Sequence, residues 1–135
     1  MVNLWISSDA LDTDFTAKLI DVYPPSEEYP EGFHLPLEDS IRRARFRDGF
    51  DSEKLMNPGE IYEVQIELPP VSNQFAKGHR IRLDISSSNF PRFDINPNTG
   101  EPIGRHTKTQ KATNTVYTGS EYPSNIVLPI VQITD

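Results

Sequence analysis

The sequence predicts an all-β protein, an antiparallel β-sandwich of the jelly-roll type, and three observations support this prediction. Apolar and polar residues alternate over several short segments, as they do in half-buried strands. No segment repeats its apolar residues at the spacing of a long amphipathic helix. The 12 prolines and 7 glycines of the 135-residue chain stand between the alternating segments, where turns are expected. A fold of seven or eight short strands follows.

The individual strands are expected where alternation is bounded by turn-forming residues. They cover residues 1–8, 15–23, 41–47, 60–68, 80–86, 113–117 and 126–133. Residues 24–39 contain four prolines and several acids, so we expect an irregular excursion there. Residues 51–56 predict one short helical turn, because Asp51 or Ser52 can cap its start and Pro58 follows its end. Pro129 within the last strand favours an edge position or a bulge.

Alternation also predicts which side chains face the core. The expected inward residues are Val2, Leu4 and Ile6 in the first strand, Tyr62, Val64, Ile66 and Leu68 in the fourth, and Ile81, Leu83 and Ile85 in the fifth. Trp5 is expected on the opposite face of the first strand. Lys77 and Gly78 predict a turn that leads into the fifth strand, and His79 is interpreted as part of that turn.

Length and composition bound the class of protein. A chain of 135 residues with 36% hydrophobic residues is expected to form one packed domain over 1–135. The formal net charge of -7 repels phosphate backbones and anionic lipid, so neither nucleic acid nor a membrane is an expected partner. The basic run 42–47 is interpreted as strand arginines that pair with carboxylates. No apolar run approaches the roughly 20 residues of a membrane span.

The sequence lacks the patterns of a catalytic centre. A serine hydrolase needs a nucleophile in a Gly-x-Ser-x-Gly turn, and this motif is absent. The three histidines, His34, His79 and His106, are far apart and form no zinc pattern. The chain has no cysteine, which excludes a thiol nucleophile and disulfides but assigns no compartment. We therefore expect no catalytic residue and no cofactor within this chain.

One weak metal candidate is present near the N-terminus. Asp9, Asp12 and Asp14 are close enough in sequence to bind calcium through a turn. The segment lacks the glycine and the terminal glutamate of an EF-hand loop. Turn capping by these aspartates is the favoured interpretation.

The segment after the fifth strand is the strongest candidate for a contact site. It contains Phe90, Pro91, Arg92 and Phe93, and two phenylalanines separated by proline and arginine cannot place all of their bulk on one strand face. Other aromatic or arginine side chains that the core need not absorb are Trp5, Tyr29 and Phe33. Such residues mark a binding surface when they cluster. Exposed aromatics would also suit a carbohydrate-binding module, which is the alternative interpretation.

An ordered set of motifs resembles the C-terminal domain of the cocaine esterase and X-prolyl dipeptidyl peptidase family of α/β-hydrolases. The motifs are Ser7-Ser8-Asp9-Ala10, Asp12-Thr13-Asp14-Phe15-Thr16-Ala17-Lys18-Leu19, Arg43-Ala44-Arg45-Phe46-Arg47, Pro58-Gly59-Glu60, Gly78-His79-Arg80-Ile81-Arg82, Ser86-Ser87-Ser88-Asn89-Phe90-Pro91-Arg92-Phe93-Asp94 and Asn96-Pro97-Asn98-Thr99-Gly100. Each motif alone is weak, but together they cover nearly the whole chain in order.

The resemblance implies a jelly-roll, galactose-binding-like domain that follows a catalytic α/β-hydrolase domain in the same parent protein. That domain would carry the catalytic Ser, Asp and His and hydrolyse esters or amides of acyl and aminoacyl substrates, as a dipeptidyl peptidase, esterase or acylase. Relative to the family pattern, the first strand looks truncated and the excursion 24–39 is long.

The resemblance also implies that this domain packs on the hydrolase and helps to wall its substrate cleft. The residues expected to dock are Asn89, Phe90, Pro91, Arg92, Phe93 and Asp94. Arg92 would then pair with a carboxylate across the interface. With this loop uncovered, the isolated domain is expected to be able to self-associate.

Overall fold

The computed structural model describes residues 1–131, which form seven strands and one short 3-10 helix. The strands are β1 (Val2–Ser8), β2 (Asp14–Tyr23), β3 (Phe33–Arg43), β4 (Tyr62–Ile66), β5 (Arg80–Ser86), β6 (Asn114–Tyr117) and β7 (Asn125–Ile126). The 3-10 helix η1 covers Ala44–Phe46. Within these residues no helix is long and apolar enough to cross a bilayer.

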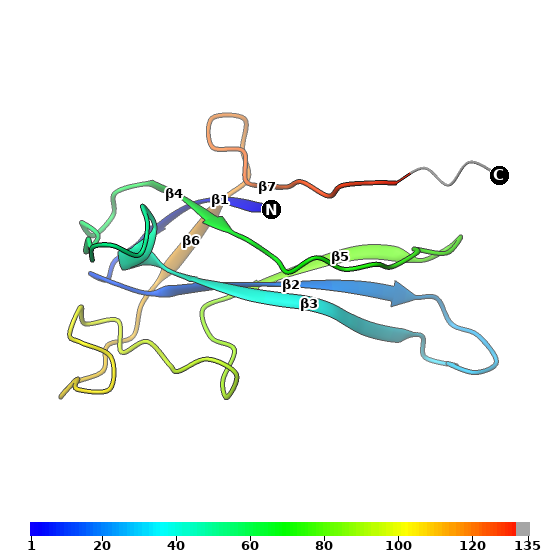
Figure 1. Cartoon of the computed structure of the whole chain (residues 1–135), viewed down its shortest axis with the longest axis horizontal. Helices are drawn as coiled ribbons and strands as arrows, with labels where there is room; N and C mark the ends of the chain where they lie inside the picture. Colours follow the sequence, from blue (N-terminus) through cyan, green and yellow to red (C-terminus); the bar gives the residue numbers. More distant parts are fainter. Residues whose placement is uncertain (132–135) are drawn as a thin grey trace.

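The strands form two antiparallel sheets that lie one over the other (Figure 1). One sheet has the order β4-β1-β6, and β7 also pairs with β1. The other has the order β3-β2-β5. All pairings are antiparallel, so the predicted antiparallel β-sandwich is confirmed. The hairpin between β2 and β3 projects at one end of the sandwich, and the long segment between β5 and β6 lies at the other (Figure 1).

The core lies between the two sheets and is built by alternation along β1, β2 and β4. The buried apolar residues that form it are Val2, Leu4, Ile6, Phe15, Ala17, Ala44, Met56, Val64 and Ile66. Each large aliphatic or aromatic side chain buried in this way contributes roughly 1.5–3 kcal/mol. The inward faces predicted for β1 and β4 are therefore correct, with Tyr62 and Leu68 packed at the margin of the core.

The face predicted for β5 is only partly correct. Leu83 and Ile85 pack against the core, but Ile81 is 52% exposed. Ile81 pairs with Asp21, which lies near the hairpin end, beyond the apolar part of the sandwich. Alternation along the strand is unbroken, but the opposing sheet does not cover its first residues.

The irregular excursion predicted over 24–39 is too long, because β3 already begins at Phe33. Pro36 lies inside β3, where it pairs with Ile20 at a shift of register next to Leu19. Proline is tolerated there because β3 is an edge strand and the ladder is locally irregular. A high density of prolines therefore does not exclude a strand at the edge of this sheet.

The helical turn predicted at 51–56 is absent, and the strand predicted at 41–47 ends at Arg43. The reason is a set of backbone hydrogen bonds to distant carbonyls: the amide of Lys54 donates to Arg45, and the amide of Met56 donates to Leu11. The segment stays extended, and the only helical turn among the described residues is η1. The last predicted strand is observed only as β7, and residues 132 and 133 lie outside the described part.

Candidate docking site

A buried ion pair holds the end of the sandwich that carries the predicted contact loop. Arg45 is 1% exposed, and its Nε lies 2.7 Å from Oδ2 of Asp12, which is fully buried. The backbone amide of Arg45 donates to the other carboxylate oxygen of Asp12. Its remaining nitrogens donate to Glu53 and to the carbonyl of Glu101. Every charge-bearing atom of this arginine is thereby used inside the protein.

Asn96 connects this ion pair to the long segment between β5 and β6. Its side-chain nitrogen donates to Asp12 at 2.8 Å and to Asp14 at 2.7 Å. Asp14 also accepts two hydrogen bonds from Arg43, one at 2.9 Å and one at 3.1 Å. The nitrogen that makes the longer of these bonds, Nη2, also donates to the carbonyl of Asp94. The chain on the C-terminal side of the contact loop is therefore fixed to the start of β2.

The charges around Arg43 strengthen this attachment. Partial burial lowers the pKa of Arg43, but the hydrogen bonds and the charge of Asp14, with smaller contributions from Asp12 and Asp94, outweigh burial and raise it. The guanidinium therefore stays protonated over the whole accessible pH range.

Residues 89–94, which we call the docking loop, are fixed on their N-terminal side by Asp39 of β3. The side-chain nitrogen of Asn89 donates to Asp39 at 2.8 Å, and Arg92 forms an ion pair with the same carboxylate. Arg92 is expected to pair with a carboxylate across an interface. In this structure it pairs with a carboxylate of its own chain, Asp39. Arg92 also lies 5.7 Å from the ring of Phe93, which is half-buried.

Phe90 is the most exposed large apolar side chain of the docking loop. Its side chain is 66% exposed, and the Phe90-Pro91 peptide bond is cis. Pro91 and Asp94 are also exposed, as is Ile95 immediately after the loop, at 58%. The loop therefore presents an apolar tip between two points of attachment.

The three aspartates of the weak calcium candidate have other partners. Asp12 and Asp14 bind Arg45, Arg43 and Asn96, and Asp9 accepts a hydrogen bond of 2.7 Å from the amide of Thr113. That bond lowers the pKa of Asp9. In residues 1–131 no group of three His, Asp or Glu side chains is arranged to hold a metal ion. The arrangement gives no support to calcium binding.

The three histidines do not meet. His79 follows the Lys77-Gly78 turn, as expected, and its Nδ1 lies 2.8 Å from Oδ1 of the buried Asp21. Asn73 donates to the other oxygen of Asp21, and the ring of Tyr23 lies 4.2 Å from that of His79. Within residues 1–131 no serine or threonine hydroxyl forms a hydrogen bond with either His79 or Asp21. The pair links the segment before β5 to β2.

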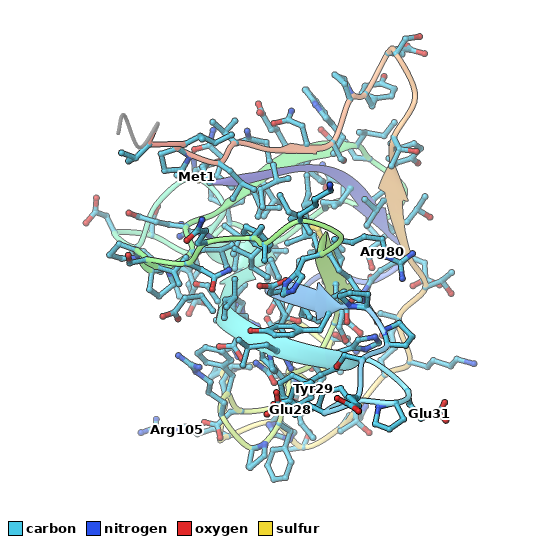
Figure 2. The ribbon with its side chains drawn as sticks, turned by 90° about the vertical axis from the view of Figure 1, so that its right-hand side faces the viewer. Met1, Glu28, Tyr29, Glu31, Arg80 and Arg105 are labelled. Carbon is cyan, nitrogen blue, oxygen red and sulfur yellow. The ribbon has the colours of Figure 1, made fainter. Side chains whose placement is uncertain are left out.

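The other predicted aromatic candidates lie in separate places. Trp5 packs on Tyr122 on the outer face of β1, with ring centroids 5.3 Å apart. Tyr29 and Phe33 stack at 5.0 Å in the hairpin between β2 and β3. Figure 2 shows Tyr29 at the hairpin tip beside Glu28 and Glu31. These side chains and Phe90 therefore do not form one aromatic platform.

Asp39 is the member of this site that the sequence does not reveal. It lies in a segment rich in prolines and acids, and nothing in its neighbours in sequence distinguishes it from the other carboxylates of that segment. Its position depends on the pairing of Lys18 with Asp39 in β2 and β3. That pairing is visible only once the strands are assembled.

The fold and the site define a β-sandwich domain without a catalytic constellation of its own among the described residues. The chain belongs to the family described as the X-Pro dipeptidyl-peptidase C-terminal non-catalytic domain, whose model matches residues 1–127. The resemblance of the sequence motifs to this family is thereby confirmed.

Curated and solved relatives agree with the family. The chain is 47% identical to a cocaine esterase from Rhodococcus sp. (strain MB1 Bresler) over 131 residues, which are 96% of this chain and 22% of that protein. The crystal structure of an aminopeptidase from a marine sediment Thaumarchaeota archaeon superposes with a TM-score of 0.83 and 36% identity, over 91% of this chain and 21% of that one. An α-amino acid ester hydrolase gives a TM-score of 0.82 and 34% identity, over 92% and 22% of the two chains.

The chain thus spans about a fifth of the length of these relatives. The relatives are larger proteins in which this region is one domain. The predicted fold class is confirmed by the two antiparallel sheets and by these structural matches.

Proposed function

We propose that this chain is the C-terminal accessory domain of a larger serine hydrolase, and that it docks on the catalytic α/β-hydrolase domain of the same parent protein and helps to wall its substrate cleft. The observation that supports the proposal is the docking loop. Phe90 is exposed at its tip, while Asn89 and Arg92 hold the loop on Asp39. A rigid loop with an apolar tip loses little conformational freedom when a partner covers it.

The parent reaction is proposed from the named relatives. A cocaine esterase, an aminopeptidase and an α-amino acid ester hydrolase all contain this domain. Their names share the hydrolysis of an ester or amide of an acyl or aminoacyl group. A serine hydrolase of the esterase, acylase or dipeptidyl peptidase class is therefore the proposed parent. The domain contributes structure and not a reacting group.

The chemistry of the docking loop indicates what it contacts. Because Arg92 is already paired with Asp39, the loop offers an apolar contact through Phe90 and does not require a carboxylate on the partner. We therefore assign the docking contact to a mainly apolar pocket on the catalytic domain that receives the ring of Phe90. In the isolated chain the same ring is available for self-association.

The proposal is tested in the full-length parent enzyme with Phe90→Ser. Loss of a buried anchor at an interface costs about 2 kcal/mol, so the thermal midpoint of the parent is expected to fall and kcat/KM with an acyl ester substrate is expected to decrease. The isolated chain carrying Phe90→Ser should unfold at an unchanged urea concentration, because the ring is exposed there.

The matched control is Phe50→Ser. Phe50 is 77% exposed and lies outside the docking loop, where Arg42 of β3 packs over its ring. This change should therefore leave the parent enzyme unaltered. Equal effects of the two substitutions, or no effect of Phe90→Ser on either the thermal midpoint or the kinetics of the parent, would contradict the proposed docking.

A further inference from the structure

The outer face of the β3-β2-β5 sheet is divided into two halves. Register places His34, Val22 and Arg80 in one row across the three strands, and Pro36, Ile20 and Arg82 in the next. These residues alternate with Leu83 and Ile85, which face the core, so the rows lie on the opposite side of the sheet.

The docking loop covers only one half of this outer face. It is attached to Asp39 and Arg43 of β3, which lie toward the η1 end. The two rows near the hairpin are not covered by it. In Figure 2, which faces the hairpin end, Arg80 lies above the hairpin that carries Tyr29. Ile20 and Val22 are nevertheless 5% and 6% exposed, because the stems of the flanking side chains lie over them.

A shallow cavity of about 300 Å³ opens in this uncovered half. It is lined by Val22, His34, Arg80, Ile81 and Arg82. Three of the five lining residues carry basic nitrogens, and none carries a carboxylate. This composition is unusual for a chain with 20 acidic and 13 basic residues, since an anion is repelled by the molecule as a whole but attracted at this point.

The two arginines of this cavity differ in the number of hydrogen bonds that they already make within the chain. Arg82 donates from two nitrogens to Asp84, at 2.6 Å and 3.0 Å, and its third nitrogen lies 3.5 Å from Nδ1 of His34. Arg80 makes no side-chain hydrogen bond or ion pair in the part of the chain that the structure describes. Arg82 is thus held in place, and the guanidinium of Arg80 keeps a planar pair of donors that matches the geometry of a carboxylate.

We propose that this cavity binds a carboxylate that carries a short apolar body, such as the C-terminal residue of a peptide. Arg80 binds the carboxylate, with His34 and the outer nitrogen of Arg82 beside it. The apolar stems of the two arginines, which lie beside Val22 in the lining, contact the apolar body. The site is separate from the docking loop, and its occupation does not depend on the proposed function.

The test uses the isolated chain and four small probes, which are N-acetyl-leucine, N-acetyl-leucinamide, acetate and inorganic phosphate. The readout is the backbone amide chemical shifts of Val22, His34 and Ile81. N-acetyl-leucine is expected to produce saturable shifts at these amides. N-acetyl-leucinamide, which differs only in lacking the carboxylate, should produce none. Acetate, which lacks the apolar body, should bind more weakly. Arg80→Gln is expected to weaken N-acetyl-leucine binding roughly fivefold.

The control is Arg105→Gln. Arg105 is another exposed arginine, in the long segment between β5 and β6. Its loss changes the net charge equally and should leave the affinity unchanged. An equal loss in the two variants would show attraction by net charge alone and overturn the proposal. So would equal binding of the amide, equal binding of inorganic phosphate, or the absence of saturable shifts.

Discussion

Arg45 is the residue on which the loop end of the sandwich depends most. It lies at the junction of Asp12, Glu53 and the carbonyl of Glu101, which belong to three different loops. Removing one partner of a buried ion pair leaves the other charge without compensation. The cost falls on the folded state, because in the unfolded chain both groups are hydrated.

We therefore predict that Arg45→Met destabilises the isolated chain by about 3–5 kcal/mol, measured as the free energy of unfolding in urea. Lys54→Met is the matched control, because the ion pair of Lys54 with Asp48 is more than half exposed on both sides. Such pairs contribute about 1 kcal/mol or less. Similar losses in the two variants would mean that the buried pair does not stabilise this end of the fold.

At the scale of an element, the hairpin between β2 and β3 depends on a single backbone conformation. Gly32 precedes β3 and has a φ of +77°. A Cβ atom at this position would lie 2.7 Å from the carbonyl oxygen of Tyr23. Only glycine can therefore return the chain from the proline-rich loop into register with β2.

Gly32→Ala is accordingly expected to cost more than Gly59→Ala. Gly59 has a similar φ of +83° but no atom within 4 Å of the added methyl group, so it isolates the backbone penalty of roughly 1 kcal/mol. The additional loss at Gly32 measures the steric conflict with Tyr23. Urea unfolding of both variants checks the prediction, and equal losses would place the entire cost in the backbone conformation.

At the scale of the whole molecule, acid stability is set partly by exposed carboxylates that act as hydrogen-bond acceptors. Hydrogen bonds from Thr107, then from Thr99 and the amide of Lys108, hold the pKa of Glu101 below its ordinary value of 4.5. Asp48 and Glu60 also have lowered pKa values, through Lys54 and through Asn57 with Tyr62. A carboxylate with a lowered folded-state pKa stabilises the protein above its ordinary pKa and loses this contribution as the pH falls through the folded-state value.

Glu101→Gln should therefore reduce stability near neutral pH, and the difference from the unmodified chain should shrink as the pH falls below 4.5 and Glu101 becomes protonated. Glu31→Gln is the control, because Glu31 accepts no side-chain hydrogen bond in residues 1–131. Urea unfolding over a pH series checks this. A difference that stays constant with pH would show that protonation of Glu101 is not involved.

The sequence correctly predicts strands in which one face is entirely apolar. The prediction is wrong where a contact between distant segments outweighs the local pattern of residues. β1 and β4 are predicted with their correct faces, because alternation alone decides which side of each strand is buried. β3 is missed over residues 33–40 because Pro36 is interpreted as a strand breaker, although an edge strand tolerates it. The helical turn is misplaced because the amides of Lys54 and Met56 bind carbonyls of Arg45 and Leu11, which are distant in sequence.

The sequence singles out the docking loop as a candidate site, but it does not predict the contacts that hold this loop in place. Phe90 and Arg92 are found from composition, because two phenylalanines around an arginine do not fit one strand face. The pairing of Arg92 with Asp39 is not predictable, since it depends on a register shift in the β2–β3 ladder. The cluster of His34, Arg80 and Arg82 is likewise formed only by the pairing of three strands.

The attachment of Asn96 to Asp12 and Asp14 also has a consequence for the order of folding. These residues are 84 and 82 positions apart in sequence, so their contact carries a large loop-closure cost and forms only after the strands between them have paired. The docking loop precedes Asn96 and is fixed by the same end of the fold. A catalytic domain that recognises Phe90 while the docking loop is held by these contacts would therefore bind the completed sandwich and would not bind partly folded chains.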